Sequence, residues 1–254
     1  MKPMFLAALL ALVTVCAAQP ALAQKDPVAD PLIATVESMK HSVARLLCYS
    51  RLQSPTPTSL GSAFFISSSG TFLTAAHVFS QISEQPDFCR FAAVAVPVDA
   101  WDPELREEFH TWFPFRPADC KIDNELDVAR CRTIDNVSIL RTDMTFAVRP
   151  AQIEWNSPPD GSEVGIIGFP LGVRDPMTSR AVVSTSRIVW NEGKRSPELL
   201  LDRPSLPGSS GSPVFLSDGR VVGIVVGNGT GDITGLTLAR PGASFRKLLD
   251  DAKK

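Results

Sequence analysis

Histidine is the usual side chain for moving protons near neutral pH, and the chain holds only three: His41, His77 and His110. His77 has the most informative surroundings, because it ends a strand-like run, TFLTAAHV, that begins at Thr71 after the turn SSG. The two alanines before it leave room for the ring to face a cleft. A lone histidine is more often structural, so His77 is a candidate base only if the chain also supplies a nucleophile.

A serine between glycines supplies that nucleophile. Ser210 lies in the segment LPGSSGSPVF at residues 206–215. A GSSGS string is often a flexible linker, but Pro207 and Pro213 bracket this one and an apolar run follows at once. The glycines permit a tight turn that presents a hydroxyl and neighbouring backbone N–H groups on one side. Because serine is a weak nucleophile until a base removes its proton, the pattern predicts that His77 is its partner.

Short apolar runs between turns are the elements that would position these residues. The chain holds 16 Gly and 21 Pro, and Val, Ile and Phe concentrate in the runs between them. The first series of predicted strands covers residues 43–49, 62–67, 71–75, 91–96, 119–122 and 127–132. The second covers residues 152–155, 163–168, 181–190, 199–201, 213–216, 221–226 and 236–239. Each series is long enough to close a small barrel, which favours an all-β double β-barrel over a single sandwich.

Two short helices complete this architecture. Apolar residues at helical spacing predict a helix over residues 30–40, and the tail at 243–254 has a similar amphipathic pattern. We expect the first barrel to cover residues 42–142 and the second to cover residues 143–242.

The N-terminus has the pattern of a signal peptide. Lys2 precedes an apolar run over residues 4–18, and a small-x-small motif then predicts cleavage after Ala23, which leaves residues 24–254 as the mature chain. A transmembrane anchor is disfavoured because the run is shorter than the roughly 20 residues that a span needs. Lipidation at Cys16 is disfavoured because a valine precedes it. We expect a periplasmic or secreted protein with no stable membrane insertion.

Four cysteines remain after that cleavage, namely Cys48, Cys89, Cys120 and Cys131. An even number in an oxidising compartment predicts two disulfides, in any of three connectivities. No CxxC pair or nearby histidine accompanies them, so no metal site is expected. The 25 Lys and Arg against 27 Asp and Glu argue against binding to nucleic acid or to an anionic membrane by electrostatics alone.

Five aromatic residues gather in a segment that is longer than a simple strand connection. They are Trp101, Phe109, Trp112, Phe113 and Phe115. We expect a local hydrophobic cluster over the first barrel, with a lid or a partner-binding patch as the alternative.

The motifs around the two reactive residues resemble those of chymotrypsin-fold (trypsin-like) serine peptidases of the bacterial exported type. TAAH after GSAFFISSSGTFL, GSSGSPV followed by DGRVVGI, and the order His, Asp, Ser carry the resemblance, which covers residues 42–250. The segment EVGIIGFP at residues 163–170 is similar to HtrA-type protease domains, although we expect no PDZ domain here. The resemblance implies two six-stranded antiparallel barrels, with His and Asp from the first and Ser from the second.

The resemblance also assigns roles to individual residues. The family's acid begins a strand with the pattern Asp, apolar, Ala, which LDVARC matches at Asp127, although Arg130 stands where the family has an aliphatic residue. Asp135 is the runner-up. In the implied mechanism His77 takes the proton of Ser210, Asp127 orients the imidazole, and the oxyanion binds the N–H groups of Gly208 and Ser210. No cofactor is needed.

The residues expected to contact substrate differ from those that select Lys or Arg in trypsin and Glu in glutamyl endopeptidases. Pro204 stands where trypsin has the acidic residue that selects Lys or Arg, and Val225 stands where glutamyl endopeptidases have a histidine. With Val226 and Gly227 these positions leave a small or apolar preference. The sequence thus predicts an exported serine endopeptidase that acts on peptides or proteins. The alternative is an inactive protease-fold protein that binds peptides or proteins.

Overall fold

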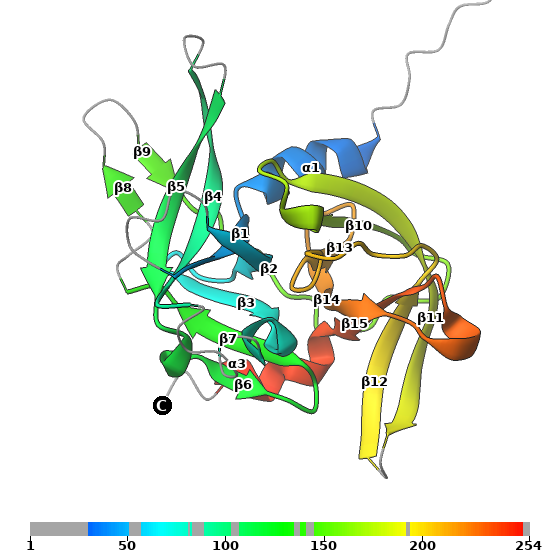
Figure 1. Ribbon diagram of the computed structural model, residues 1–254. Coiled ribbons are helices and arrows are strands. Elements are labelled where there is room, and N and C mark those ends of the chain that lie inside the picture. Colours follow the sequence, from blue (N-terminus) through cyan, green and yellow to red (C-terminus); the bar gives the residue numbers. More distant parts are fainter. Residues whose placement is uncertain are drawn as a thin grey trace, which may run out of the picture.

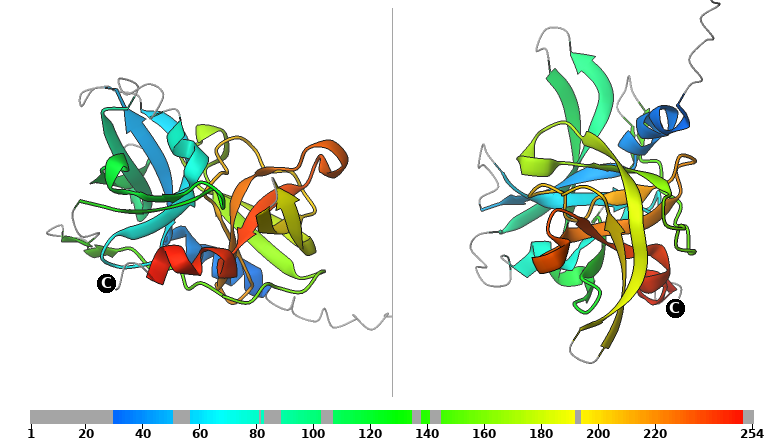
Figure 2. Two further views of the ribbon diagram at one scale, coloured as in Figure 1. Left: turned by 90° about the horizontal axis from the view of Figure 1, so that it is seen from below. Right: turned by 90° about the vertical axis from the view of Figure 1, so that its right-hand side faces the viewer.

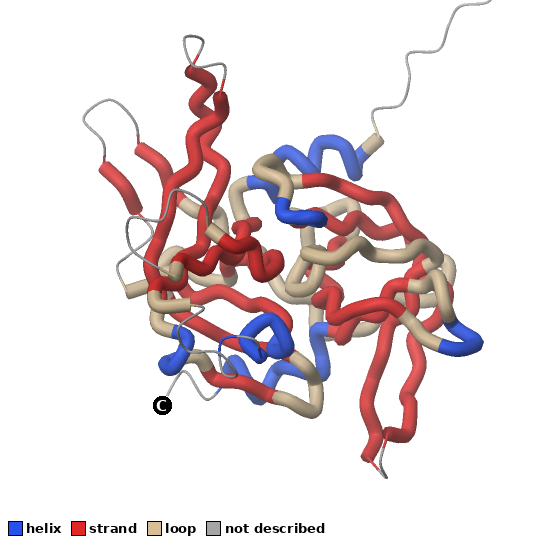
Figure 3. Tube along the Cα trace, in the orientation of Figure 1, coloured by secondary structure: helices blue, strands red, loops and turns tan. Residues whose placement is uncertain are grey.

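Most of the described strands form two large sheets that lie side by side, one on the left and one on the right of Figure 1. A computed structural model of the chain describes residues 30–50, 57–80, 82, 89–102, 107–134, 138–140, 145–191 and 194–250. The predicted signal peptide and the aspartate at position 135 lie outside these residues. Strands dominate the described part, and helices are short (Figure 3).

The first sheet has seven antiparallel strands in the order β5-β4-β1-β2-β3-β7-β6. They are β1 (Val43–Tyr49), β2 (Thr58–Phe65), β3 (Thr71–Ala75), β4 (Phe91–Asp102), β5 (Glu107–Phe115), β6 (Lys121–Asp123) and β7 (Val128–Arg132). A single bridge between Phe115 and Thr133 joins the end of β5 to the chain beyond β7. The sheet therefore curls into a half-barrel, with β6 added outside β7, where the sequence predicts six closed strands.

The second sheet is a closed six-stranded barrel, as predicted, in the order β10-β11-β12-β15-β14-β13. Its strands are β10 (Glu163–Gly168), β11 (Met177–Asn191), β12 (Lys194–Leu201), β13 (Pro213–Phe215), β14 (Val221–Asn228) and β15 (Thr237–Pro241). The strand predicted at residues 152–155 does not form, since only Ile153 makes an isolated bridge, to Val221. The prolines at 158 and 159 have no N–H with which to extend a ladder. A small hairpin, β8 (Ser138–Leu140) and β9 (Thr145–Ala147), was not predicted.

The aromatic residues lie on two paired strands, Trp101 at the end of β4 and the other four on β5, a pairing that the sequence analysis did not predict. Phe113 and Phe115 are buried in the first core, where their rings meet Phe65 and Phe72 edge to face. Trp112 faces outward. The expected hydrophobic cluster therefore exists in part, as the inner face of a strand.

Helices are the first and the last elements of the described part of the chain. The first is α1 (Pro31–Lys40), which the Asp30 carboxylate caps by accepting the Leu32 N–H at 2.9 Å. The last is α3 (Arg246–Asp250), which lies beside β6 and β7 in Figure 1. Short 3₁₀ turns link the other elements: η1 (Ala76–Phe79), η2 (Pro117–Asp119), η3 (Pro170–Gly172), η4 (Gly231–Ile233) and η5 (Gly242–Phe245).

Buried apolar side chains form a core inside the first sheet, a core inside the second barrel, and a third cluster between the two. The left view of Figure 2 shows the two sheets on either side of this boundary. At that boundary Phe64 and Leu73 of the first sheet pack with Ile167, Phe169 and Phe215 of the second. Full burial of one such side chain stabilises the fold by about 1.5–3 kcal/mol. This apolar boundary holds the two sheets together beside the candidate site.

Two cysteine pairs lie at disulfide distance, both in the first sheet. Cys48 pairs with Cys89, with Cα atoms 5.2 Å apart, and Cys120 pairs with Cys131, with Cα atoms 4.3 Å apart. This is one of the three connectivities that the sequence left open. The second bridge encloses the β6–β7 turn and therefore Asp127.

Candidate active site

His77 lies where the first sheet faces the second. It follows β3 directly and sits in the 3₁₀ turn η1. Its carbonyl accepts the Ser80 hydroxyl at 2.7 Å, which holds the turn, and 44% of its side chain stays exposed. The imidazole is thus fixed at its backbone but open to a bound molecule.

Asp127 makes two hydrogen bonds to His77 and one to the preceding residue, Ala76. Its Oδ2 is 2.7 Å from His77 Nδ1, and its Oδ1 accepts the His77 backbone N–H at 2.7 Å. The Asp127 carbonyl accepts the N–H of Ala76 at 3.1 Å. A carboxylate in this position fixes which imidazole nitrogen carries the proton, and it stabilises an imidazolium.

The β6–β7 turn supports this position of Asp127. Its φ of 56° lies in the left-handed region, which aspartate tolerates better than most residues. Asp123 Oδ1 accepts the N–H groups of Glu125 and Leu126 at 3.1 and 3.0 Å, which closes the turn. From the second barrel, Arg240 Nε donates to the Leu126 carbonyl at 2.9 Å. The turn is therefore held from both sheets.

A buried carboxylate in turn orients that arginine. Glu198 accepts Arg240 Nη1 at 3.2 Å with one oxygen and Arg187 Nη2 at 3.3 Å with the other. The side chains of Glu198 and Arg240 are 11% and 14% exposed, so the pair is shielded from water. The network links β15, β12 and β11 to the turn that bears Asp127.

The imperfect match of the acid motif has a structural reason. Arg130 Nη1 donates to the Leu249 carbonyl at 3.4 Å, so its side chain contacts the C-terminal helix. It makes no contact with Asp127. The runner-up at position 135 lies outside the described residues, and its placement is left open.

Ser210 comes from the second barrel and meets His77 across the boundary. Its Oγ is 2.9 Å from His77 Nε2. Gly211, with a φ of +88°, turns the chain here, and a Cβ at this residue would lie 2.0 Å from the Ser62 carbonyl oxygen. The Ser62 N–H donates to the Ser210 carbonyl at 2.8 Å. Close approach of the two sheets therefore requires glycine beside the serine.

Hydrogen bonds to the carbonyls of Pro207 and Ser209 fix the orientation of the two peptide groups that carry the N–H groups of Gly208 and Ser210. The Pro207 carbonyl accepts the Leu171 N–H at 2.6 Å, and the Ser209 carbonyl accepts an N–H three residues later at 2.9 Å. In a trans peptide the N–H points opposite to the carbonyl, so the N–H groups of Gly208 and Ser210 point away from these partners. Neither has an acceptor within the described ranges.

The other residues predicted to contact substrate lie on β14 and in the loop before Ser210. Val225 is buried, and its carbonyl accepts the N–H next to Ser210 at 2.8 Å. Val226 and Gly227 are partly exposed, and Pro204 is exposed. The loop that carries Pro204 is tied to β14 because the Asn228 side chain bonds the backbone of the residue after Pro204 in both directions, at 2.8 Å each.

The sequence analysis missed three residues that shape this site. Ser62 Oγ donates to the Gly208 carbonyl at 2.8 Å and accepts the Phe169 N–H at 2.8 Å, so it joins β2 to two loops of the second barrel. Leu171 has a φ of 56° and orients the peptide of Gly208. Asn228 ties β14 to the preceding loop. The only signal for Ser62 is a serine in an otherwise apolar strand, and nothing in the sequence points to the other two.

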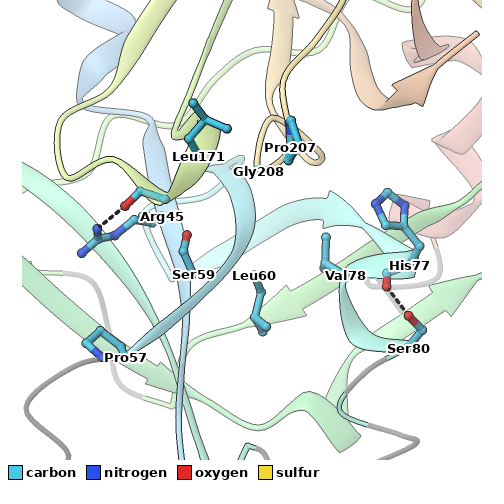
Figure 4. A pocket seen from close by; sticks show the side chains of 11 residues that line it. Arg45, Pro57, Ser59, Leu60, His77, Val78, Ser80, Leu171, Pro207 and Gly208 are labelled. Atoms are coloured by element: carbon cyan, nitrogen blue, oxygen red, sulfur yellow. Dashed lines mark hydrogen bonds between the residues drawn. The ribbon is translucent and has the colours of Figure 1, made fainter.

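A cavity of about 590 Å³ opens beside His77 and Gly208 (Figure 4). It extends along β2 and η3 to Arg45 of β1. Among the residues that the structure describes, no cluster of His, Cys, Asp or Glu could hold a metal ion. Within the same residues, no helix has the length and hydropathy of a membrane span.

Comparison with known proteins places this geometry in context. The family model described as "Trypsin-like peptidase domain" matches residues 61–224. No curated protein matches the chain.

Solved structures share the fold. The chain superposes on the Rv3671c protease of M. tuberculosis in its active form with a TM-score of 0.61 and 16% identity, over 98% of this chain and 92% of that one. For an inactive mutant form the TM-score is 0.62 at 16% identity, over 94% and 96%. For a serine endoprotease of Yersinia pestis the TM-score is 0.61 at 19% identity, over 89% and 67%.

Proposed function

Because this chain belongs to the trypsin-like peptidase family, we propose that it is an exported serine endopeptidase that uses His77, Asp127 and Ser210. The observation that carries the proposal is the continuous path of two hydrogen bonds, from Asp127 Oδ2 to His77 Nδ1 and from His77 Nε2 to Ser210 Oγ, at 2.7 and 2.9 Å. A nucleophile, a base and an orienting carboxylate in this order are what acyl transfer needs.

The proposed reaction proceeds in two halves. His77 Nε2 accepts the Ser210 proton while Oγ attacks the peptide carbonyl, and the N–H groups of Gly208 and Ser210 bind the oxyanion. The imidazolium then gives its proton to the leaving amine, and an acyl-enzyme remains on Ser210. Water repeats the attack with His77 as base, which releases the acid and restores the serine. Asp127 stays ionised and stabilises the imidazolium in both halves.

Export is supported by the leader-like N-terminus and by the two cysteine pairs, which an oxidising compartment favours. We expect cleavage after Ala23. Sequencing of the N-terminus of protein recovered after expression with its leader checks this part of the proposal.

Labelling with a fluorophosphonate tests the catalytic part. We expect the probe on Ser210, located by peptide mass spectrometry, and we expect Ser210→Ala and His77→Ala to abolish it. Ser209→Ala is the matched control, because it alters the neighbouring hydroxyl and should leave labelling intact. Acidification should slow labelling, because a protonated imidazole cannot take the serine proton.

Folded wild-type protein that neither reacts with the probe nor hydrolyses peptides or esters would overturn the enzyme proposal. That result would favour the alternative of a protease-fold protein that binds peptides without cleaving them.

A further inference from the structure

Arg45 is a cation without a carboxylate partner in the described structure. It lies on β1 opposite Ser62 of β2, and its side chain is partly buried. Its Nη1 donates to the carbonyls of Gly172 and Val173 at 3.2 and 3.3 Å. No described Asp or Glu lies within 4.0 Å of it, and Asp175 acts on its charge only from a longer distance. Burial lowers the pKa of the guanidinium. A partly desolvated charge of this kind is stabilised when an anion binds it.

The same cavity wall holds further unused hydrogen-bond donors. Arg45 Nε and Ser59 Oγ are both shielded from water and have no partner among the described residues, and both residues line the cavity. Figure 4 shows them next to each other, with His77 on the opposite side of the cavity. Buried donors are nearly always satisfied in proteins, so two beside one cavity mark a place where rotation of either side chain would present a donor to an acceptor in the cavity.

The position of the cavity identifies which part of a peptide would enter it. His77 must deliver its proton to the leaving amine, so the leaving segment starts beside His77. The cavity begins at His77 and Gly208, and neither Pro204 nor the β14 residues expected to hold the acyl side line it. It therefore faces the chain that follows the cleaved bond.

We propose that Arg45 and Ser59 form a carboxylate-binding subsite for an Asp or Glu side chain within the first three residues after the cleaved bond. The inference rests on the proposed function and adds a substrate class to it. The guanidinium offers charge-assisted hydrogen bonds to the carboxylate, and the Ser59 hydroxyl offers one more when its side chain rotates toward the cavity. This preference is separate from that of glutamyl endopeptidases, whose histidine position on the acyl side is Val225 here.

Matched pairs of quenched fluorescent peptides test the subsite. Each pair carries Glu or Gln at the first, second or third position after the cleaved bond and is otherwise identical. We expect kcat/KM to favour Glu by about tenfold or more at one of these positions, the size of one charge-assisted hydrogen bond. Arg45→Gln should bring this ratio close to one, and Arg45→Glu should shift the preference to a Lys peptide.

Arg174→Gln is the matched control, because it removes a neighbouring positive charge that acts on Arg45 without lining the cavity. It should keep most of the Glu preference. Ser59→Ala, a mild change, should reduce the ratio without abolishing it.

Two results would overturn the subsite and leave the proposed function standing. The first is equal hydrolysis of Glu and Gln peptides at all three positions by the wild type. The second is an Arg45→Gln variant that slows both peptides equally, which would mean that Arg45 only holds the η3 turn. Absence of both hydrolysis and fluorophosphonate labelling would overturn the proposed function together with the subsite.

Discussion

Replacing Gly211 by alanine should loosen the junction of the two sheets and disable the candidate site. The new Cβ would lie 2.0 Å from the Ser62 carbonyl oxygen and 2.5 Å from Thr74 Oγ1. A carbon and an oxygen normally stay more than 3 Å apart, so backbone on one side must move by about 1 Å. Because Ser62 donates its N–H to the Ser210 carbonyl, the nucleophile moves with it.

Two contributions set the size of the effect. A side chain at a φ of +88° costs about 1–2 kcal/mol, and overpacking costs about 1–3 kcal/mol more. The sum of about 2–5 kcal/mol lowers the melting temperature by about 10 °C in a protein of this length. A displacement of about 1 Å at the nucleophile lowers the acylation rate by about a hundredfold.

Gly161→Ala separates the two contributions. Gly161 has a φ of +85°, and in the described structure a Cβ there meets nothing within 4 Å. It should therefore show only the conformational cost, with a melting temperature lowered by about 3 °C and an unchanged rate of fluorophosphonate labelling. Thermal unfolding and labelling are measured on both variants. Equal losses of stability, or normal labelling of Gly211→Ala, would refute the argument that this contact fixes the position of the serine.

Three further variants test other parts of the structure. Asp127→Asn should lower kcat by about 10³–10⁴-fold while urea unfolding stays unchanged, because it favours the wrong imidazole tautomer; a loss below tenfold would contradict the assigned role. Glu198→Gln should destabilise the fold by about 3 kcal/mol in urea unfolding, since it leaves the shielded charge of Arg240 and the partly exposed charge of Arg187 without their carboxylate; an unchanged midpoint would show that the network adds nothing. The pKa of Asp30 is lowered from 3.8 by its hydrogen bonds to an arginine side chain and to the α1 backbone. Its charged form therefore stabilises the fold fully above pH 3.8, and this contribution is lost as the pH falls through the lower pKa of the folded state. Asp30→Asn should lower the urea unfolding midpoint at pH 7, and by less as the pH falls below 3.8.

Most strands were predictable because turn residues bound them clearly. The predicted and observed ranges agree for β1, β3 and β10, whose apolar runs end at glycines, serines or charged residues. The β5 strand escaped prediction because its residues mix charged and aromatic types without a clean alternation, and its pairing with β4 spans a long hairpin. Closure of the first sheet depends on the single Phe115–Thr133 bridge, which no local pattern predicts.

The local signals for His77 and Ser210 are strong, since each stands in a short motif that a turn requires. The structure places His77 within hydrogen-bond distance of both Ser210 and Asp127, whereas the catalytic roles of these residues stay predictions. Arg45 and Ser59 could not be singled out from the sequence. They meet because of the register between β1 and β2 and because of the path of η3, and both are set by the whole fold.

The division of the candidate site between two sheets has a consequence for how the chain is made. Synthesis proceeds from the N-terminus, so the residues of the first sheet, including His77 and Asp127, are made before Ser210. The N–H of Ser62, which would hold the serine in place, then has no partner to bond. A partly made chain therefore pairs no base with a nucleophile, and the His77–Ser210 contact on which the proposed activity depends forms only after the second barrel has been synthesised.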